Sequence, residues 1–336
     1  MFDERFNLGV DMYYKKTVDM LLQADVPGQS GSYRQWQNLG QVDNKGLEIS
    51  VGGAIIKTKN FEWVSNINFN TNKNVIVSLG SVDYVPVNVA GGHIVEVGRA
   101  IVGQAIGTGW GYVFDGIYQI DDFTDNTYST LKPGVVSFAG QAVKPGDMKF
   151  KNIDGDPNNV ITPEGDKTVI SNSQPKHFGG FNNTFSYKNF DASIFFQWSY
   201  GNQILNVGRY RYEGYIPYFN IRRDYWNGHW TVDNPSNRYP RLQGAGTTQA
   251  SSYYVEDGSY LRLKNIVLGY NLPQKLARKL TLNNLRFYVS ADNVLTFTRY
   301  SGYDPEVSYW NPLLTGLDYT SYPRSSVFTF GMNLKF

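Results

Sequence analysis

The chain has 336 residues, of which 31 are basic and 29 acidic, so its formal charge at pH 7 is only +2. It has no cysteine, while 15% of its residues are Phe, Trp or Tyr. A near-neutral balance argues against a dedicated nucleic-acid binder, which needs a clustered excess of Lys and Arg. The lack of cysteine excludes a disulfide framework, a thiolate metal site and a cysteine nucleophile.

The aromatic residues, together with 34 glycines, favour β structure with frequent turns. No apolar run approaches the ~20 residues of a transmembrane helix. The absence of such a run does not exclude a transmembrane β-barrel, because the strands of a barrel alternate apolar and polar residues and are polar on average. Residues 1–5 mix acidic and basic side chains with no apolar stretch behind them, so they do not resemble a secretory signal peptide. We expect either a cytoplasmic protein or a piece of a longer precursor.

Apolar and polar residues alternate in segments along the whole chain. This period of two predicts strands with one apolar and one wet face. The clearest case is the last, where Phe328, Phe330 and Met332 alternate with Thr329 and Gly331. The other segments with this pattern are 6–14, 47–55, 181–187, 191–200 and 285–297.

The lengths of the strands and loops favour a membrane barrel over a soluble sandwich. Several strands reach about 10 residues, above the ~5–6 of globular sheets but suited to a tilted membrane strand. Short turns are predicted at 58–60 and 188–189, whereas 20–44, 80–177, 201–252 and 298–325 are long and rich in turn residues. Short turns on one side and long loops on the other are typical of outer-membrane barrels.

Two local features interrupt the strand pattern. Residues 273–280 begin with proline and continue as a basic, amphipathic run, which predicts a short helix at one of the short turns. The preceding segment 260–272 changes phase: Leu261 and Leu263 fall on one face, but Ile266 and Leu268 on the other. Either a bulge or a strand that leaves the membrane band would explain the change.

Five motifs carry a family resemblance that covers essentially the whole chain, in the family's order. They are WGY at 110–112, DGIYQ at 115–119, GDMKFKNIDGD at 146–156, VEDGSYLRLKN at 255–265 and SGYDPEV at 301–307. In combination they resemble the C-terminal half of a SusC-like (SusC/RagA family) TonB-linked outer-membrane transporter.

The resemblance implies an all-β fold, namely part of a transmembrane antiparallel β-barrel with short periplasmic turns and long extracellular loops. Residues 1–336 would form the C-terminal part of a TonB-dependent receptor barrel, roughly eight to ten of an expected 22 strands. The plug domain and TonB box of the family are not present in this chain. Two of those strands are expected at 93–102 and 105–119.

The end of the chain resembles the C-terminal signal by which outer-membrane barrels are recognised for insertion. Its residues are Thr329, Gly331, Leu334 and the terminal Phe336. The alternative is an ordinary amphipathic strand at a chain end.

Residues 152–166 resemble a calcium loop, in which oxygen side chains at alternate positions converge on a hard cation. The candidate ligands are Asn152, Asp154, Asp156 and Asp166. The sequence departs from the family pattern because Pro157 stands where a glycine makes the sharp turn. The alternative is a solvated turn rich in Asp and Asn, so calcium is a possible cofactor only.

Aromatic residues in the long loops are candidates for substrate binding, since flat rings stack on sugars or clamp peptides. The alternative for each is an interfacial belt or loop packing. The six candidates are Trp110, Tyr225, Trp226, Trp230, Tyr309 and Trp310.

No catalytic constellation emerges, so no catalytic residue is assigned. His93, His177 and His229 lie on different segments without a partner at diagnostic spacing. The glycine-rich run 107–111 lacks the rest of either nucleotide fingerprint.

The resemblance implies transport rather than enzymatic chemistry: TonB-dependent uptake of a large nutrient, with an oligosaccharide favoured over a peptide, across the outer membrane of a Gram-negative, Bacteroidetes-type cell. The resemblance implies a SusD-like surface lipoprotein and the TonB complex as partners, and no nucleic acid. The alternatives are a surface-exposed all-β glycan-binding module and an outer-membrane barrel enzyme.

Overall fold

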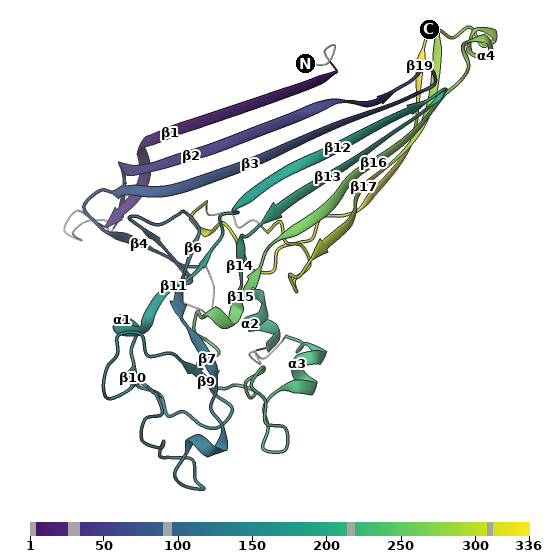
Figure 1. Cartoon of the computed structure of the whole chain (residues 1–336). Coiled ribbons are helices and arrows are strands. Elements are labelled where there is room, and N and C mark those ends of the chain that lie inside the picture. Colours follow the sequence, from purple (N-terminus) through teal and green to yellow (C-terminus); the bar gives the residue numbers. More distant parts are fainter. Residues whose placement is uncertain (1–4, 26–33, 90–95, 214–218, 308–311) are drawn as a thin grey trace.

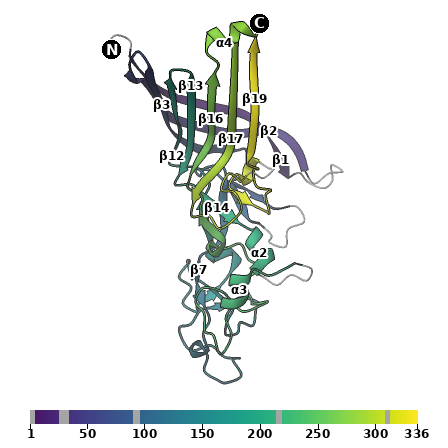
Figure 2. The same ribbon diagram turned by 90° about the vertical axis from the view of Figure 1, so that its right-hand side faces the viewer.

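The computed structural model describes residues 5–25, 34–89, 96–213, 219–307 and 312–336. It has two parts, a large curved sheet and a smaller unit of loops, short strands and short helices at one end of that sheet (Figures 1 and 2). We call them the wall and the outer unit.

The wall contains eight antiparallel strands in the described residues, in the order β1-β2-β3-β12-β13-β16-β17-β19. Most are far longer than the strands of an ordinary soluble sheet. Their bounds are β1 Phe6–Asp25, β2 Arg34–Lys57, β3 Phe61–Leu79, β12 His177–Tyr187, β13 Phe190–Tyr200, β16 Tyr260–Asn271, β17 Asn284–Thr298 and β19 Val327–Lys335.

The register of the wall sorts its side chains into two faces. Phe330 lies opposite Val289, which lies opposite Leu268, so apolar residues form rows across neighbouring strands. One step along, Thr329 lies opposite Ser290. Because cross-strand neighbours share a face, the predicted alternation produces one continuous apolar face and one polar face.

Short and long connections lie at opposite ends of the wall, as the sequence predicts (Figure 1). Thr58–Asn60 and Lys188–Asn189 connect strands tightly, with Lys188 in the left-handed region at φ 52°. The helix predicted at 273–280 is α4, Gln274–Lys279, at the same end. Its one buried residue, Ala277, packs with Leu282 and Leu285.

The phase change in β16 is a bulge. The pairing with β17 shifts between Leu263 and Asn265, and the pairing with β13 shifts between Phe195 and Phe196. An extra residue at Lys264 lets both Leu263 and Leu268 face the apolar side.

Two predictions about segments were wrong. Segment 20–44 is not a loop throughout, because β1 runs to Asp25 and β2 starts at Arg34. The segments 93–102 and 105–119 do not add strands to the wall: their described parts form β5, β6 and β7 of the outer unit, and residues 90–95 lie outside the described residues. Val97, Tyr112 and Tyr118 pack into the core of the outer unit. Ala100 packs against Val42, Ile76 and Leu79 of the wall.

The outer unit consists of short sheets and helices inserted between wall strands. A four-stranded sheet has the order β11-β6-β5-β4, a three-stranded sheet β15-β14-β18, and two pairs are β10-β8 and β7-β9. The strands are β4 Tyr84–Val87, β5 Gly98–Ile101, β6 Thr108–Tyr112, β7 Phe114–Ile117, β8 Ser137–Phe138, β9 Met148–Phe150, β10 Val160–Ile161, β11 Lys167–Asn172, β14 Gln203–Asn206, β15 Val255–Asp257 and β18 Leu317–Asp318. The helices are α1 Pro163–Asp166, α2 Gly208–Glu213 and α3 Arg223–Gly228, with 3₁₀ turns at Ile120–Asp122, Ser252–Tyr254 and Pro312–Leu314.

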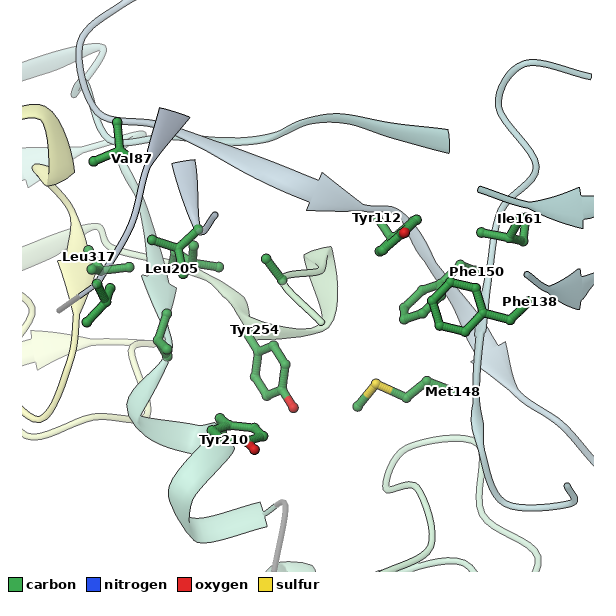
Figure 3. Packing of buried hydrophobic residues seen from close by; sticks show 14 of the residues in the cluster. Val87, Tyr112, Phe138, Met148, Phe150, Ile161, Leu205, Tyr210, Tyr254 and Leu317 are labelled. Atoms are coloured by element: carbon green, nitrogen blue, oxygen red, sulfur yellow. The ribbon is translucent and has the colours of Figure 1, made fainter. Parts of the chain in front are cut away.

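The outer unit has its own hydrophobic core (Figure 3). Tyr112 stacks on Phe150 with ring centroids 4.8 Å apart, and Phe138 meets both rings edge-on at 5.5 Å. Tyr112 belongs to the WGY motif and Phe150 to the GDMKF motif, whereas Phe138 lies on β8. Burial raises the pKa of Tyr112 to about 12, because the ionised form would lose its water.

The wall is open in this chain. β1 and β19 lie at its two ends and do not pair with each other, so the number of strands in a complete barrel stays a prediction. Within the described residues, no helix is both long and apolar enough to cross a membrane.

Candidate functional site

A stripe of asparagine side chains lies along β3 on the polar face of the wall. Residues two apart in a strand share a face, and the segment 66–74 places asparagine at every second position. Asn72 and Asn74 both donate to the side-chain oxygen of Asn44 on β2, at 3.1 and 2.9 Å. The stripe consists of Asn66, Asn68, Asn70, Asn72 and Asn74.

A concavity of about 560 Å³ lies beside this stripe, near the ends of the strands that lead to the outer unit. Its polar side chains and rings come from β3, β12, β13 and the start of β16. The six that define it are Asn68, Asn70, Gln197, Phe178, Phe195 and Tyr260. We call it the wall pocket.

Close backbone approaches set the floor of the wall pocket. The Asn68 side-chain oxygen accepts from the Gly180 N–H at 2.5 Å, and Asn70 donates to the Phe178 carbonyl at 3.4 Å. The Phe195 ring covers Gly180, where an added Cβ would lie 2.8 Å from the ring. Glycine at this position therefore lets the ring lie flat against the wall.

Glu306, from the SGYDPEV motif, orients the other side of the wall pocket. Its Oε1 accepts from the Tyr260 hydroxyl at 3.1 Å and from the Gln197 amide at 3.4 Å. Its other oxygen, Oε2, accepts from Arg262 Nη1 at 2.6 Å. A loop residue thus fixes two pocket side chains that belong to the wall.

Arg262 anchors the same loop to the wall. Its side chain is only 2% exposed, and it donates to Asp304 Oδ1 at 2.5 Å and to Thr296 at 2.9 Å, besides Glu306. Arg324 makes a more exposed ion pair with Glu306 at 3.2 Å. Two of the family motifs, VEDGSYLRLKN and SGYDPEV, therefore meet in one ion cluster.

Asp304 is ionised in this cluster. Its burial opposes the charge, but hydrogen bonds from Arg262 and from the Glu306 and Arg324 N–H groups outweigh that cost and hold the pKa of Asp304 below its usual value. The arrangement neutralises a guanidinium that would otherwise be buried alone.

The wall pocket suits a neutral ligand rich in hydroxyl or amide groups. Carboxamides both donate and accept hydrogen bonds, and the three rings offer flat apolar surface. Among the described residues that line it, none carries a charge. Alternation alone did not single out these residues, although the repeat of asparagine at 66–74 is visible in the sequence.

Of the six candidate aromatic residues, two are buried in the outer unit. Tyr225 donates to the Pro240 carbonyl at 2.9 Å, and burial raises the pKa of its hydroxyl. Trp230 donates to Gln119 of the DGIYQ motif at 3.0 Å. These contacts support packing, the alternative reading, for both.

The other candidates differ in exposure. Trp226, on α3, is 54% exposed and lies 5.5 Å from the His229 ring. Trp110 lies against the Arg99 guanidinium at 4.2 Å. Tyr309 and Trp310 lie outside the described residues. A substrate role for these side chains stays a prediction.

The candidate calcium ligands form a turn closed by local hydrogen bonds. Asn152 accepts from Gly155 N–H, Asp154 from Asp156 N–H, and the fully buried Asp166 from the Ile153 and Thr162 N–H groups. In the described part of the chain, no group of three or more His, Cys, Asp or Glu could hold a metal ion. The contacts support the solvated turn, and calcium binding stays a prediction.

The candidate insertion signal lies on β19, which pairs with β17. Thr329 and Gly331 lie on the polar face, where the Tyr288 ring covers Gly331, while Leu334 continues the apolar row. Phe336 follows the strand and is 82% exposed. Its recognition by an insertion machinery stays a prediction.

A long-stranded antiparallel sheet with one apolar face, one polar face and all long connections at one end is typical of part of a transmembrane β-barrel. No family model matches the chain. It is 38% identical over its full length to the TonB-dependent receptor P3 of Formosa agariphila, covering 33% of that protein, and 27% identical over 99% of its length to the TonB-dependent receptor SusC of Bacteroides thetaiotaomicron, covering 30%.

A solved structure of the RagAB peptide transporter matches the whole chain, with a TM-score of 0.77, 26% identity and 34% of that chain covered. Along its whole length the chain is similar to part of the SusC-like TonB-dependent receptors, which are outer-membrane transporters rather than enzymes. It spans about one third of the length of the curated relatives it matches.

Proposed function

We propose that this chain forms the C-terminal part of the barrel wall of a receptor that takes up a large nutrient across the outer membrane. In the whole receptor, the polar face would line the lumen and surround a plug. The TonB complex would supply the energy through the N-terminal region of the receptor.

The wall pocket is the observation that carries the proposal. It opens on the polar face at the level where the strands meet the outer unit, so a ligand entering from the cell surface would reach it early. Its amides and rings are fixed by Gly180 and Glu306 before any ligand arrives, which reduces the entropic cost of binding.

We propose an oligosaccharide as the nutrient. Sugar rings present apolar faces to aromatic side chains and hydroxyl groups to carboxamides, and the wall pocket offers both. The structurally similar RagAB complex is a peptide transporter, so a peptide is the competing substrate. We further propose that a SusD-like lipoprotein covers the outer unit, where the exposed Trp226 would be available to it or to the substrate.

Truncating the ring of Phe195 tests the wall pocket. We expect Phe195→Ala in the whole receptor to weaken oligosaccharide binding by about 30-fold, equivalent to ~2 kcal/mol for a central aromatic contact. The matched control is Phe196→Ala, since Phe196 is the next residue on the same strand but lies on the apolar face. Isothermal titration against oligosaccharide and peptide pools gives the measurement.

The two pools separate the substrate classes. Binding of peptides alone would overturn the choice of oligosaccharide, and equal losses in the Phe195 and Phe196 variants would overturn the wall pocket as the site. Uptake of labelled ligand by cells with and without TonB then tests transport itself.

A further inference from the structure

A group of lysines interrupts the apolar face of the wall, and Val75 follows Lys73 on the same face of β3. Tyr14 on β1 lies opposite Lys45 on β2, which lies opposite Lys73 on β3. Lys16 follows two residues after Tyr14 on the same face. We call Tyr14 and the three lysines the basic rim.

The basic rim belongs to the outward face and not to the lumen. On β2 and β3 the next pair along the same face is Leu47 and Thr71, followed by Ile49 and Phe69. No register shift interrupts the pairing between these rows, so the lysines share the face of the apolar rows. The polar face carries Asn44 and Asn72 instead.

The height of the basic rim corresponds to lipid headgroups. On β3, the outward face of the nine residues from Phe61 to Phe69 is apolar or aromatic except at Ser65, and a tilted strand needs about 9–11 residues to cross the hydrocarbon. Lys73 lies four residues beyond Phe69 toward the long connections, or about 9 Å higher for a strand tilted by ~45°. Such loops face the cell exterior, so the basic rim faces the outer leaflet.

The protein balances the positive charge of the basic rim only in part, because Asp43 lies opposite Lys16 on the same face and attracts both Lys16 and Lys45. Lysines directly opposite on neighbouring strands repel each other, and Lys45 and Lys73 form such a pair. In the described parts of the chain, no carboxylate lies within ion-pair distance of either ammonium group. Asp43, the nearest acidic residue on this face, accepts hydrogen bonds from the Tyr14 hydroxyl and from Gln41.

Tyr14 gathers two of the ammonium groups. The Lys45 Nζ lies 5.0 Å and the Lys16 Nζ 5.5 Å from the centre of its ring. Cation–π attraction therefore directs both toward one spot above the apolar band. Met12, 80% exposed, and Leu47 lie directly below, where an acyl chain would pack.

We propose that the basic rim binds the phosphate group of an anionic glycolipid in the outer leaflet. A phosphate would neutralise the Lys45–Lys73 pair, while the lipid chains would cover Met12 and Leu47. This site lies outside the lumen and does not depend on the nutrient that the receptor carries.

The experiment uses the purified whole receptor and two probes, monophosphorylated lipid A and the same lipid after removal of its phosphate. Binding is measured by native mass spectrometry and by fluorescence titration in detergent. The test variant is Lys16→Gln, Lys45→Gln, Lys73→Gln. The matched control is Lys59→Gln, Lys188→Gln, Lys279→Gln, which removes three exposed lysines at the short-turn end of the wall.

We expect the unaltered receptor and the control to prefer the phosphorylated lipid, and the test variant to bind it about 100-fold more weakly, at about five-fold for each lysine. A variant with arginine at the three rim positions should retain the preference and shows that folding is not the cause of the loss. Equal binding of both lipids, or an equal loss in the control, would overturn the proposal. Competition by inorganic phosphate alone at micromolar concentration would point to free phosphate as the ligand instead and would also overturn it.

Discussion

Replacing Arg262 by methionine is expected to detach the loop 299–326 from the wall, at a cost of about 3–5 kcal/mol in the free energy of opening that loop. The replacement leaves Asp304 and Glu306 buried without their main counter-charge. Hydrogen exchange of the backbone amides of 301–306, measured by mass spectrometry on the whole receptor, gives the change in opening free energy.

The control for this variant is Arg324→Met. Arg324 also pairs with Glu306, but its side chain is 51% exposed, and such surface ion pairs contribute at most about 1 kcal/mol. Equal protection of the loop in the Arg262 and Arg324 variants would show that the cluster does not anchor it. Because Glu306 orients Tyr260 and Gln197, the Arg262 variant should also weaken ligand binding at the wall pocket.

Acid should weaken the same anchor. The pKa of Asp304 is lower in the folded protein than in the unfolded chain, so its stabilising contribution is complete above the unfolded value of about 4 and is lost as the pH falls through the lower folded value. We expect protection of 301–306 to fall below about pH 4 in the unaltered receptor and to respond less in Asp304→Asn. An identical acid response of both proteins would exclude Asp304 as the group responsible.

Asp147→Ala should destabilise the outer unit by about 3–5 kcal/mol. The Asp147 carboxylate is fully buried, and it accepts from Arg241 Nε at 2.6 Å, Lys144 N–H at 2.7 Å and Ala245 N–H at 2.9 Å. Alanine would leave all three donors without this acceptor. Limited proteolysis of the segment 201–259 in the whole receptor, followed with increasing urea, measures the loss.

Asp125→Ala is the matched control for Asp147. Asp125 accepts from the Thr127, Ser129 and Thr130 N–H groups, but it does so within one partly exposed turn. Its replacement should therefore have a clearly smaller effect on proteolysis. A comparable effect of both replacements would mean that local turn geometry, and not the link between 144–147 and 241–245, stabilises the outer unit.

The sequence was sufficient to predict the part of the fold that faces lipid. Where a strand crosses an apolar medium, one face must be apolar, and this requirement produces the alternation at 285–297 and 328–336. The turn at Lys188–Asn189 and helix α4 follow from equally local signals.

Beyond the apolar band the alternation ends, and the prediction failed there. Near the far end of β1 the apolar residues Met20, Leu21 and Leu22 are consecutive and the pairing with β2 shifts, so the segment 20–44 shows no period of two although its described residues are largely strand. In 93–119 the alternation is real, but a small sheet packed on Tyr112 and Ile117 satisfies it as well as a wall would.

Contacts between segments far apart in the sequence could not be predicted from local patterns either. Trp230 donates a hydrogen bond to Gln119, and Arg262 forms an ion pair with Asp304. A local sequence pattern does not identify which distant residue will be the partner in such a contact. The asparagine repeat at 66–74 differs from these contacts, because its period of two is visible in the sequence and places the carboxamides on one face.

The unequal connections also impose an order of assembly on the wall. The turns after β2, β12 and β16 are short, so the strands within each of the blocks β1–β3, β12–β13 and β16–β17 can pair locally. Such hairpins form in about 1–10 μs. The pairings between these blocks, such as Ile67 with Phe181 and Ile194 with Ile266, join residues far apart in the sequence and form only after the intervening chain has closed into a loop. The outer unit is expected to speed this loop closure, because the backbone of Ile76 on β3 forms hydrogen bonds with Gly103 and Gln104 of the outer unit. A receptor with a destabilised outer unit should therefore assemble its wall more slowly, even where every wall residue is unchanged.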